Sequence, residues 1–242
     1  MSLIKNPLII ALDVDTIKEA SILANKLGPY VGAFKVGMQL YNCEGPEAIR
    51  ILKEKNFPVF IDLKLHDIPN TVAGAARVLT RHGVSILNVH AAGGMAMMRE
   101  AVKAARDEAV KIGINRPLVV AVTVLTSIDQ QVFNNEMGVP GSIQERVVLW
   151  AKMANEAGLD GVVASPHEIT AIRKACGNDF VIITPGVRPA GVMANDQKRI
   201  MTPGEAVRQG ATYLVVGRPV TASPDPAQAA RAILKEIEEI RS

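Results

Sequence analysis

Short apolar runs alternate along the chain with longer segments of helical periodicity. Near-continuous runs of Val, Ile and Leu are typical of parallel strands that helices cover. Eight predicted strands span residues 7–14, 33–38, 59–65, 85–91, 118–125, 161–165, 180–187 and 213–220. The predicted helices span residues 16–27, 45–56, 70–82, 94–112, 142–157, 167–175, 203–209 and 225–241. This alternation indicates a parallel α/β architecture.

Eight strand–helix units in 242 residues predict a TIM (β/α)8 barrel. Ser142 and Thr202 stand where helix N-caps belong. Residues typical of helix C-terminal ends follow six of the helical patterns, namely Asn56, Gly83, Gly113, Gly158, Gly177 and Gly210. No GxGxxG motif follows the first strand, which disfavours a dinucleotide-binding fold. Nothing resembles a linker, so we expect one catalytic domain over residues 1–242.

The amino-acid composition and net charge of the chain exclude several kinds of function. The chain is 48% hydrophobic and 21% charged, which fits a globular protein with a sizeable core. A net charge of +3 and 4% aromatic residues, without a basic stripe, argue against nucleic-acid binding. Cys43 and Cys176 are too few for a disulfide framework or a cysteine-rich metal site. The sequence has no signal-like start and no apolar run of about 18 residues, so we expect a cytoplasmic protein that does not enter a membrane.

The third predicted strand and its continuation, FIDLKLHDIPNT at residues 60–71, carry unusual charge for a buried segment. Buried charges are costly unless they are paired. Strand alternation puts Asp62 and Lys64 on one face and leaves the other face apolar. We therefore expect both side chains at the barrel mouth, where such folds place catalytic groups. An alternative is a structural ion pair, and Asp67 could also favour the start of the next helix.

Other polar residues fall at the same end of the predicted barrel. Asp13 ends the first strand and Lys35 lies in the second, while Thr123 and Thr126 lie at the fifth. Asp13 and Lys35 could form an ion pair, but the convergence of charges from several strands favours a site. His90 is interpreted as a hydrogen-bonded strand-end residue. We interpret Met95, Met97 and Met98 as helix packing rather than a metal site.

The last two strands end in PGVRP (185–189) and VGRP (216–219), each with a glycine and an arginine. Glycine lets backbone N–H groups approach an anion, and arginine offers a bidentate fork. Barrels commonly bind phosphate at these two strands. The long connections at residues 127–141 and 188–201 are candidate binding or lid elements. Together these features predict a phosphorylated ligand.

Over essentially its whole length the sequence resembles the bacterial type of orotidine 5′-phosphate decarboxylase. The shared signature is D-x-K-x-x-D followed by IPNT, here residues 62–71. The segments ALDVD, FKVGMQL, NVHAAGG, TPGVRP and VGRP also match in order and spacing. The resemblance implies decarboxylation of orotidine 5′-monophosphate to uridine 5′-monophosphate (UMP), the last step of de novo pyrimidine synthesis. It also implies that no metal or organic cofactor is used.

The resemblance assigns roles by position. Lys64 would donate a proton to pyrimidine C6, and Asp62 would lie beside the departing carboxylate. Asp67 and Thr71 would reach into the site of the partner subunit in a homodimer. The other residues implied in substrate binding are Asp13 and Lys35 for the ribose, Arg188, Gly217 and Arg218 for the phosphate, Gln197 for phosphate and base, and Thr126 for the base.

Two alternatives remain at this level. Sugar-phosphate decarboxylases and aldolases of the same superfamily share D-x-K-x-x-D but use Mg²⁺, with an acidic ligand on the second strand. Lys35 occupies that strand here, and a cation opposes a divalent ion. A binding module without catalysis would be expected to lack one of Asp62, Lys64 and Asp67, and all three are present.

Overall fold

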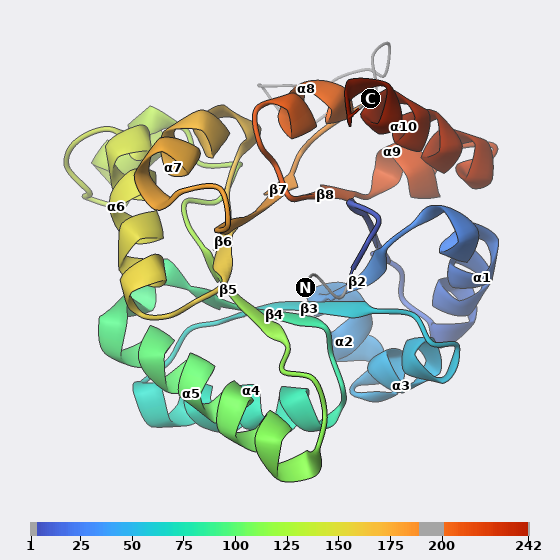
Figure 1. The fold of residues 1–242 in the computed structure, drawn as a ribbon, viewed down its shortest axis with the longest axis horizontal. Coiled ribbons are helices and arrows are strands. Elements are labelled where there is room, and N and C mark those ends of the chain that lie inside the picture. The colour runs from blue at the N-terminus through green and yellow to red at the C-terminus, as the bar shows by residue number, and fades with distance from the viewer. Residues whose placement is uncertain (1–3, 189–200, 242) are drawn as a thin grey trace.

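A computed structural model of the chain describes residues 4–188 and 201–241 (Figure 1). Within these residues, eight parallel strands pair in chain order, and the last strand pairs with the first to close a barrel. The strands are β1 (Leu8–Ala11), β2 (Ala33–Gly37), β3 (Val59–Leu65), β4 (Ile86–His90), β5 (Leu118–Val122), β6 (Gly161–Val163), β7 (Val181–Pro185) and β8 (Tyr213–Val216). The predicted TIM barrel is therefore confirmed.

Helices surround the strands on the outside of the barrel (Figure 1). The eight predicted helices correspond to α1 (Ile17–Leu27), α3 (Glu47–Glu54), α4 (Pro69–Arg81), α5 (Gly94–Ile112), α6 (Ile143–Glu156), α7 (Ile169–Cys176), α8 (Pro203–Arg208) and α10 (Pro226–Arg241). Ser142 and Thr202 are N-caps, and each forms a capping box with the glutamate three residues later. The six residues expected at helix C-terminal ends all have positive φ.

Among the described residues, two further α-helices were not predicted. Helix α2 (Met38–Glu44) follows β2 directly, and Gly45 and Pro46 separate it from α3. Helix α9 (Arg218–Thr221) lies in the segment predicted as the end of the eighth strand. Pro219 explains this difference, because proline cannot donate a ladder hydrogen bond but suits the first turn of a helix. Several other strands also stop two or three residues before their apolar runs end.

The strands pack on both faces. Outward-facing residues such as Ile10, Ile61 and Val162 join the large core between barrel and helices. A second cluster, which includes Ile9, Phe60, Ile86, Val120, Ile183 and Val215, fills the barrel interior. This interior layer fills the barrel beneath the carboxyl ends of the strands. Toward the carboxyl ends of the strands, the charged residues Lys35, Asp62 and Lys64 lie beyond this layer.

Candidate active site

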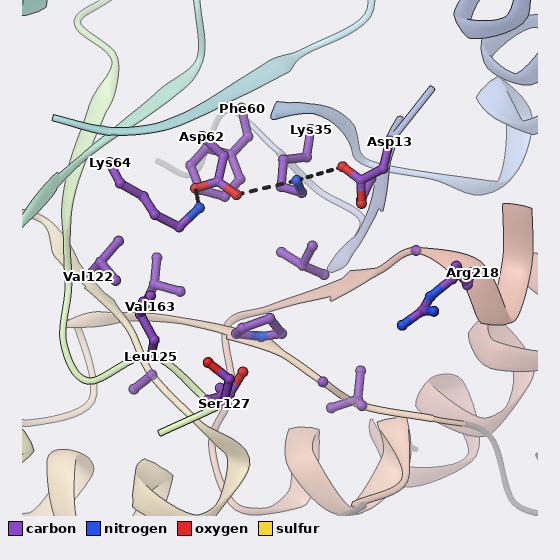
Figure 2. A pocket seen from close by; sticks show the side chains of 18 of the residues that line it. Asp13, Lys35, Phe60, Asp62, Lys64, Val122, Leu125, Ser127, Val163 and Arg218 are labelled. Atoms are coloured by element: carbon purple, nitrogen blue, oxygen red, sulfur yellow. Dashed lines mark hydrogen bonds and ion pairs between the residues drawn. The ribbon is translucent and has the colours of Figure 1, made fainter. Parts of the chain in front are cut away.

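A cavity of about 360 Å³ opens at the carboxyl ends of the strands (Figure 2). Its size is typical of a site for a small molecule. Its walls come from β1, β2, β3, β5, β6, β7, β8 and the segments that follow several of them. The predicted residues that line it are Asp13, Lys35, Asp62, Lys64, Thr126, Arg188, Gly217 and Arg218. Folding thus brings together residues from six regions of the chain.

Strand β3 departs from regular geometry where it supplies the charged residues. Ile61 pairs with Leu87, but Leu65 already pairs with Val89, so β3 bulges between these two pairs. Within the bulge Lys64 has a φ of 52°, a left-handed backbone conformation that is rare for residues other than glycine. The strict alternation expected through this segment is therefore wrong for the backbone. Both Asp62 and Lys64 nevertheless reach the cavity.

Four charged side chains of alternating sign form a continuous row across one wall of the cavity (Figure 2). Lys35 Nζ lies 3.2 Å from Asp13 Oδ1 and 3.3 Å from Asp62 Oδ2. Lys64 Nζ donates a hydrogen bond of 2.8 Å to Asp62 Oδ1. Asp13 and Lys35 are therefore both an ion pair and part of the cavity. The row places the Lys64 ammonium at its end, facing the open space.

Asp62 is the central carboxylate of this row, and its side chain is only 13% exposed. Burial alone would raise its pKa. The positive charges of Lys35 and Lys64, with hydrogen bonds from Lys64 and Asn88, outweigh that effect and hold the Asp62 pKa below its ordinary value. Asp62 is thus ionised at neutral pH and can orient both lysines.

A glycine at position 37 leaves the space that Lys35 occupies. A Cβ at this residue would lie 2.8 Å from Lys35 Nζ and 3.3 Å from Asp13 Oδ1. Such distances are too short for ordinary contact, so a side chain here would displace the ammonium. Gly37 was not predicted as a site residue, although FKVGM in the sequence places it two residues after the lysine.

The residues predicted to bind phosphate follow β7 and β8, and a Cβ on Gly217 would lie 3.7 Å from Asp13 Oδ2. Arg218 projects from the start of α9, well separated from Lys64 in the view of Figure 2. Gly186 has a φ of 81°, which explains the glycine of the PGVRP segment. Arg188 is 8% exposed, and its backbone N–H donates to the carbonyl oxygen of Met201 at 3.1 Å. Gln197 lies outside the described residues.

Between the two charged ends the cavity wall is largely apolar, with Phe60, Val122, Val163, Pro185 and Val215 among its lining residues. Thr126 and Ser127 add hydroxyl groups to the same wall. Ser127 was not predicted, because a serine at the start of a long loop gives no distinctive pattern. Thr123 has a structural role instead, since its buried hydroxyl donates to the carbonyl oxygen of Val163 at 3.0 Å.

Asp67 and Thr71 do not line the cavity of their own chain. Both side chains are exposed. Asp67 Oδ1 accepts a hydrogen bond from the backbone N–H of Ile68 at 2.6 Å, just before α4 begins. This contact orients the Asp67 carboxylate just before α4, whose start has no side-chain cap hydrogen bond.

His90 ends β4 beside His66, with ring centroids 5.4 Å apart. Burial, the neighbouring His66 and Lys64 lower the pKa of His90, so it is neutral at physiological pH. Met97 and Met98 are fully buried in the core and Met95 packs against it, as expected. Across residues 4–188 and 201–241, no group of three or more His, Cys, Asp or Glu side chains is arranged to hold a metal ion.

A closed parallel barrel with a charged mouth defines this chain as a TIM-barrel enzyme. The model of the orotidine 5′-phosphate decarboxylase / HUMPS family matches residues 6–233. The chain belongs to this family. No helix in the described parts of the chain has the length and apolar character needed to cross a membrane.

Individual relatives agree with the family assignment. The orotidine 5′-phosphate decarboxylase of Moorella thermoacetica is 56% identical over 98% of this chain and 94% of its own length. That of Heliobacterium modesticaldum is 55% identical over 97% of both chains. The crystal structure of the Lactobacillus acidophilus enzyme superposes with a TM-score of 0.85 at 38% identity, covering 96% of this chain and 99% of the other.

Proposed function

We propose that this chain decarboxylates orotidine 5′-monophosphate to UMP and CO2, with Lys64 as the proton donor. The observation that carries the proposal is the row of alternating charges from Asp13 to Lys64 inside a cavity whose other side holds Arg218. The family match and the relatives named as orotidine 5′-phosphate decarboxylases support the reaction. In this proposal the enzyme carries out the last step of de novo pyrimidine synthesis, as one catalytic domain in the cytoplasm.

The cavity suits a nucleotide that carries a phosphate at one end and a carboxylate on the base at the other. In the proposal Arg218, Arg188 and Gly217 hold the phosphate, and Gln197 bridges phosphate and base. Asp13 and Lys35 hold the ribose hydroxyls. The pyrimidine then lies against the apolar wall near Thr126, with C6 toward Lys64. Phosphate binding far from the reacting bond can supply the free energy that closes the site and excludes water.

The chemistry follows from the position of the Lys64 ammonium. When the bond between C6 and the carboxylate breaks, CO2 leaves and the electron pair stays on C6, in the plane of the ring. A preorganised cation stabilises this developing negative charge. Lys64 Nζ then transfers a proton to C6 to form UMP, and the neutral amine regains a proton from solvent. Asp62 aims the ammonium through its 2.8 Å hydrogen bond and lies beside the substrate carboxylate, which raises the ground-state free energy.

A homodimer completes the proposed site. Asp67 and Thr71 are exposed and lie outside their own cavity. In the proposal each subunit supplies these two side chains to the cavity of its partner. A second carboxylate beside Lys64 would help to keep its side chain protonated and oriented, because opposite charge favours the charged form.

The geometry around Lys35 disfavours the Mg²⁺-dependent alternative. Lys35 Nζ stands between Asp13 and Asp62, within 3.3 Å of an oxygen of each. These are carboxylates that a divalent cation would otherwise attract, and the ammonium group opposes a second cation there. The cavity therefore suits an anionic nucleotide better than a metal-bound sugar phosphate.

The direct test is the fall in absorbance of orotidine 5′-monophosphate with purified protein, measured with and without EDTA. We expect turnover that EDTA does not change. Turnover lost with EDTA and restored by Mg²⁺ would favour the metal-dependent alternative. A folded protein that binds UMP without turnover would contradict the proposed activity and favour a binding module.

A further inference from the structure

Asn88 is a buried polar residue on β4 that the proposed mechanism does not yet use. It is 1% exposed and lies inside the barrel, next to the bulge of β3. Its neighbours Leu87 and Val89 point the other way, into the helix-side core. A buried amide must be hydrogen-bonded to be tolerated. Its partners therefore show what the residue does.

Both ends of the Asn88 amide bind the catalytic segment. Oδ1 accepts a hydrogen bond of 2.8 Å from the backbone N–H of Lys64, and Nδ2 donates one of 2.7 Å to Asp62 Oδ1. The same Asp62 oxygen accepts the hydrogen bond from Lys64 Nζ. These contacts close a ring that joins the backbone of Lys64 to its own ammonium through Asn88 and Asp62.

The ring compensates for the strain in β3. The bulge between Ile61 and Leu65 takes the Lys64 N–H out of register with β4, while φ is 52°. A left-handed conformation at a residue with a long side chain persists only when its surroundings impose it. The Asn88 side chain supplies the acceptor that the irregular strand pairing does not.

We propose that Asn88 is a positioning residue that fixes the backbone of Lys64 and the carboxylate of Asp62, and thereby aims the Lys64 ammonium at the reacting carbon. This inference rests on the proposed decarboxylation. Asparagine suits the position because it offers one acceptor and one donor without charge. A carboxylate of the same shape would accept from Lys64 but repel Asp62. An aliphatic side chain would leave the Lys64 N–H without this acceptor and would remove one of the donors to Asp62.

The first test is Asn88→Ala, with kcat for orotidine 5′-monophosphate measured separately from the Kd for UMP. A misplaced ammonium should lower kcat by about 10²-fold. UMP affinity should change by less than about threefold, because the proposed phosphate and ribose contacts lie elsewhere. A kcat within about threefold of wild type, or an equal loss of UMP affinity, would overturn the proposal.

The Asn88→Asp variant tests the hydrogen-bonding role itself. It also provides a test of the proposal if the alanine variant does not fold. Asp62 and Lys64 are the charged groups that face the substituted side chain, with His90 nearby on the same strand. A protonated aspartic acid can again donate to Asp62, whereas the carboxylate cannot. The kcat of this variant relative to wild type should therefore rise as the pH falls from 8 to 5. A ratio that does not change with pH would mean a purely structural role and would overturn the proposal.

Leu87→Ala is the matched control. Leu87 is fully buried on the same strand and faces the helices. This variant should lower the melting temperature but keep kcat within about threefold of wild type. Wild-type protein in the same assay separates the two hypotheses: no turnover there refutes the decarboxylase proposal, whereas wild-type turnover with equally active Asn88 variants refutes only the positioning role.

Discussion

Lys64 Nζ lies 2.8 Å from Asp62 Oδ1, although the two residues belong to a strand whose backbone is irregular between them. The contact fixes a cation at the end of a charged row instead of leaving it free in solvent. Lys64→Ala should therefore lower kcat by at least about 10⁴-fold, because charge stabilisation and protonation are lost together. UMP binding, measured by calorimetry, should persist. Appreciable residual turnover would contradict the assigned role.

Arg218→Ala should weaken ligand binding through the phosphate. A charge-assisted hydrogen bond contributes about 1.5–3 kcal/mol, so the UMP Kd should rise by about 10- to 100-fold. Uridine lacks the phosphate and provides the control, because its affinity should be the same for variant and wild type. Calorimetric titration with both ligands measures the difference. Equal UMP affinity in both proteins would argue against phosphate binding by Arg218.

Shared sites in a homodimer can be tested by complementation. Lys64→Ala and Asp67→Ala homodimers should each be inactive. If the subunits exchange freely, a 1:1 mixture should regain about a quarter of wild-type activity, because half the dimers are mixed and each of these has one intact site. Sedimentation measures the oligomer in parallel. A mixture that stays inactive despite exchange, or a competent monomer, would rule out the shared site.

Gly37→Ala should impair catalysis without breaking the fold. Its φ of −93° allows any residue, so the effect comes from the added Cβ, 2.8 Å from Lys35 Nζ. Displacement of Lys35 should disturb Asp13 and Asp62 and lower kcat/KM by about tenfold or more. Val36→Ala is a control on the opposite face of β2, which should cost about 2 kcal/mol of stability and spare activity. Full activity of Gly37→Ala would contradict the need for space beside Lys35.

Asp62 should couple folding stability to pH. Burial acts to raise its pKa, but Lys35, Lys64 and the hydrogen bonds hold the pKa below the ordinary value. Such a carboxyl stabilises the fold above its unfolded pKa of about 3.9, and this contribution is lost as pH falls through the folded value. The difference in unfolding free energy between wild type and Asp62→Asn should shrink below about pH 4. Urea titrations at neutral and acidic pH measure it, and a constant difference would refute the coupling.

Much of the fold could be predicted because the sequence patterns that mark its helices and strands are local. Helix α5 spans the predicted residues, and capping boxes begin α6 and α8 where serine and threonine indicated. The predicted end of the third strand is correct, but most other strands end earlier than predicted, since apolar residues continue past the last ladder hydrogen bond. Helix α2 was missed because it is short and follows β2 without a break.

The site was predicted where charge is unusual for a strand, as at Asp62 and Lys64. Asn88 gave no such signal, because its two partners lie 24 and 26 residues away and become neighbours only when β3 and β4 pair. The positive φ of Lys64 was equally hidden, since lysine has no preference for that conformation. Contacts across strands depend on register, which residue patterns do not specify.

Closure of the barrel by β8 against β1 has a consequence for synthesis of the protein. Gly217 follows the last strand, yet a Cβ there would lie 3.7 Å from Asp13 Oδ2, a group made near the start of the chain. A growing polypeptide therefore carries Asp13, Lys35, Asp62 and Lys64 long before the wall formed by β7 and β8 exists. Because the strands that complete that wall pair last along the chain, truncated products that end before Arg218 would lack the anion-binding side. Enzyme activity would thus report that translation and barrel closure are both complete.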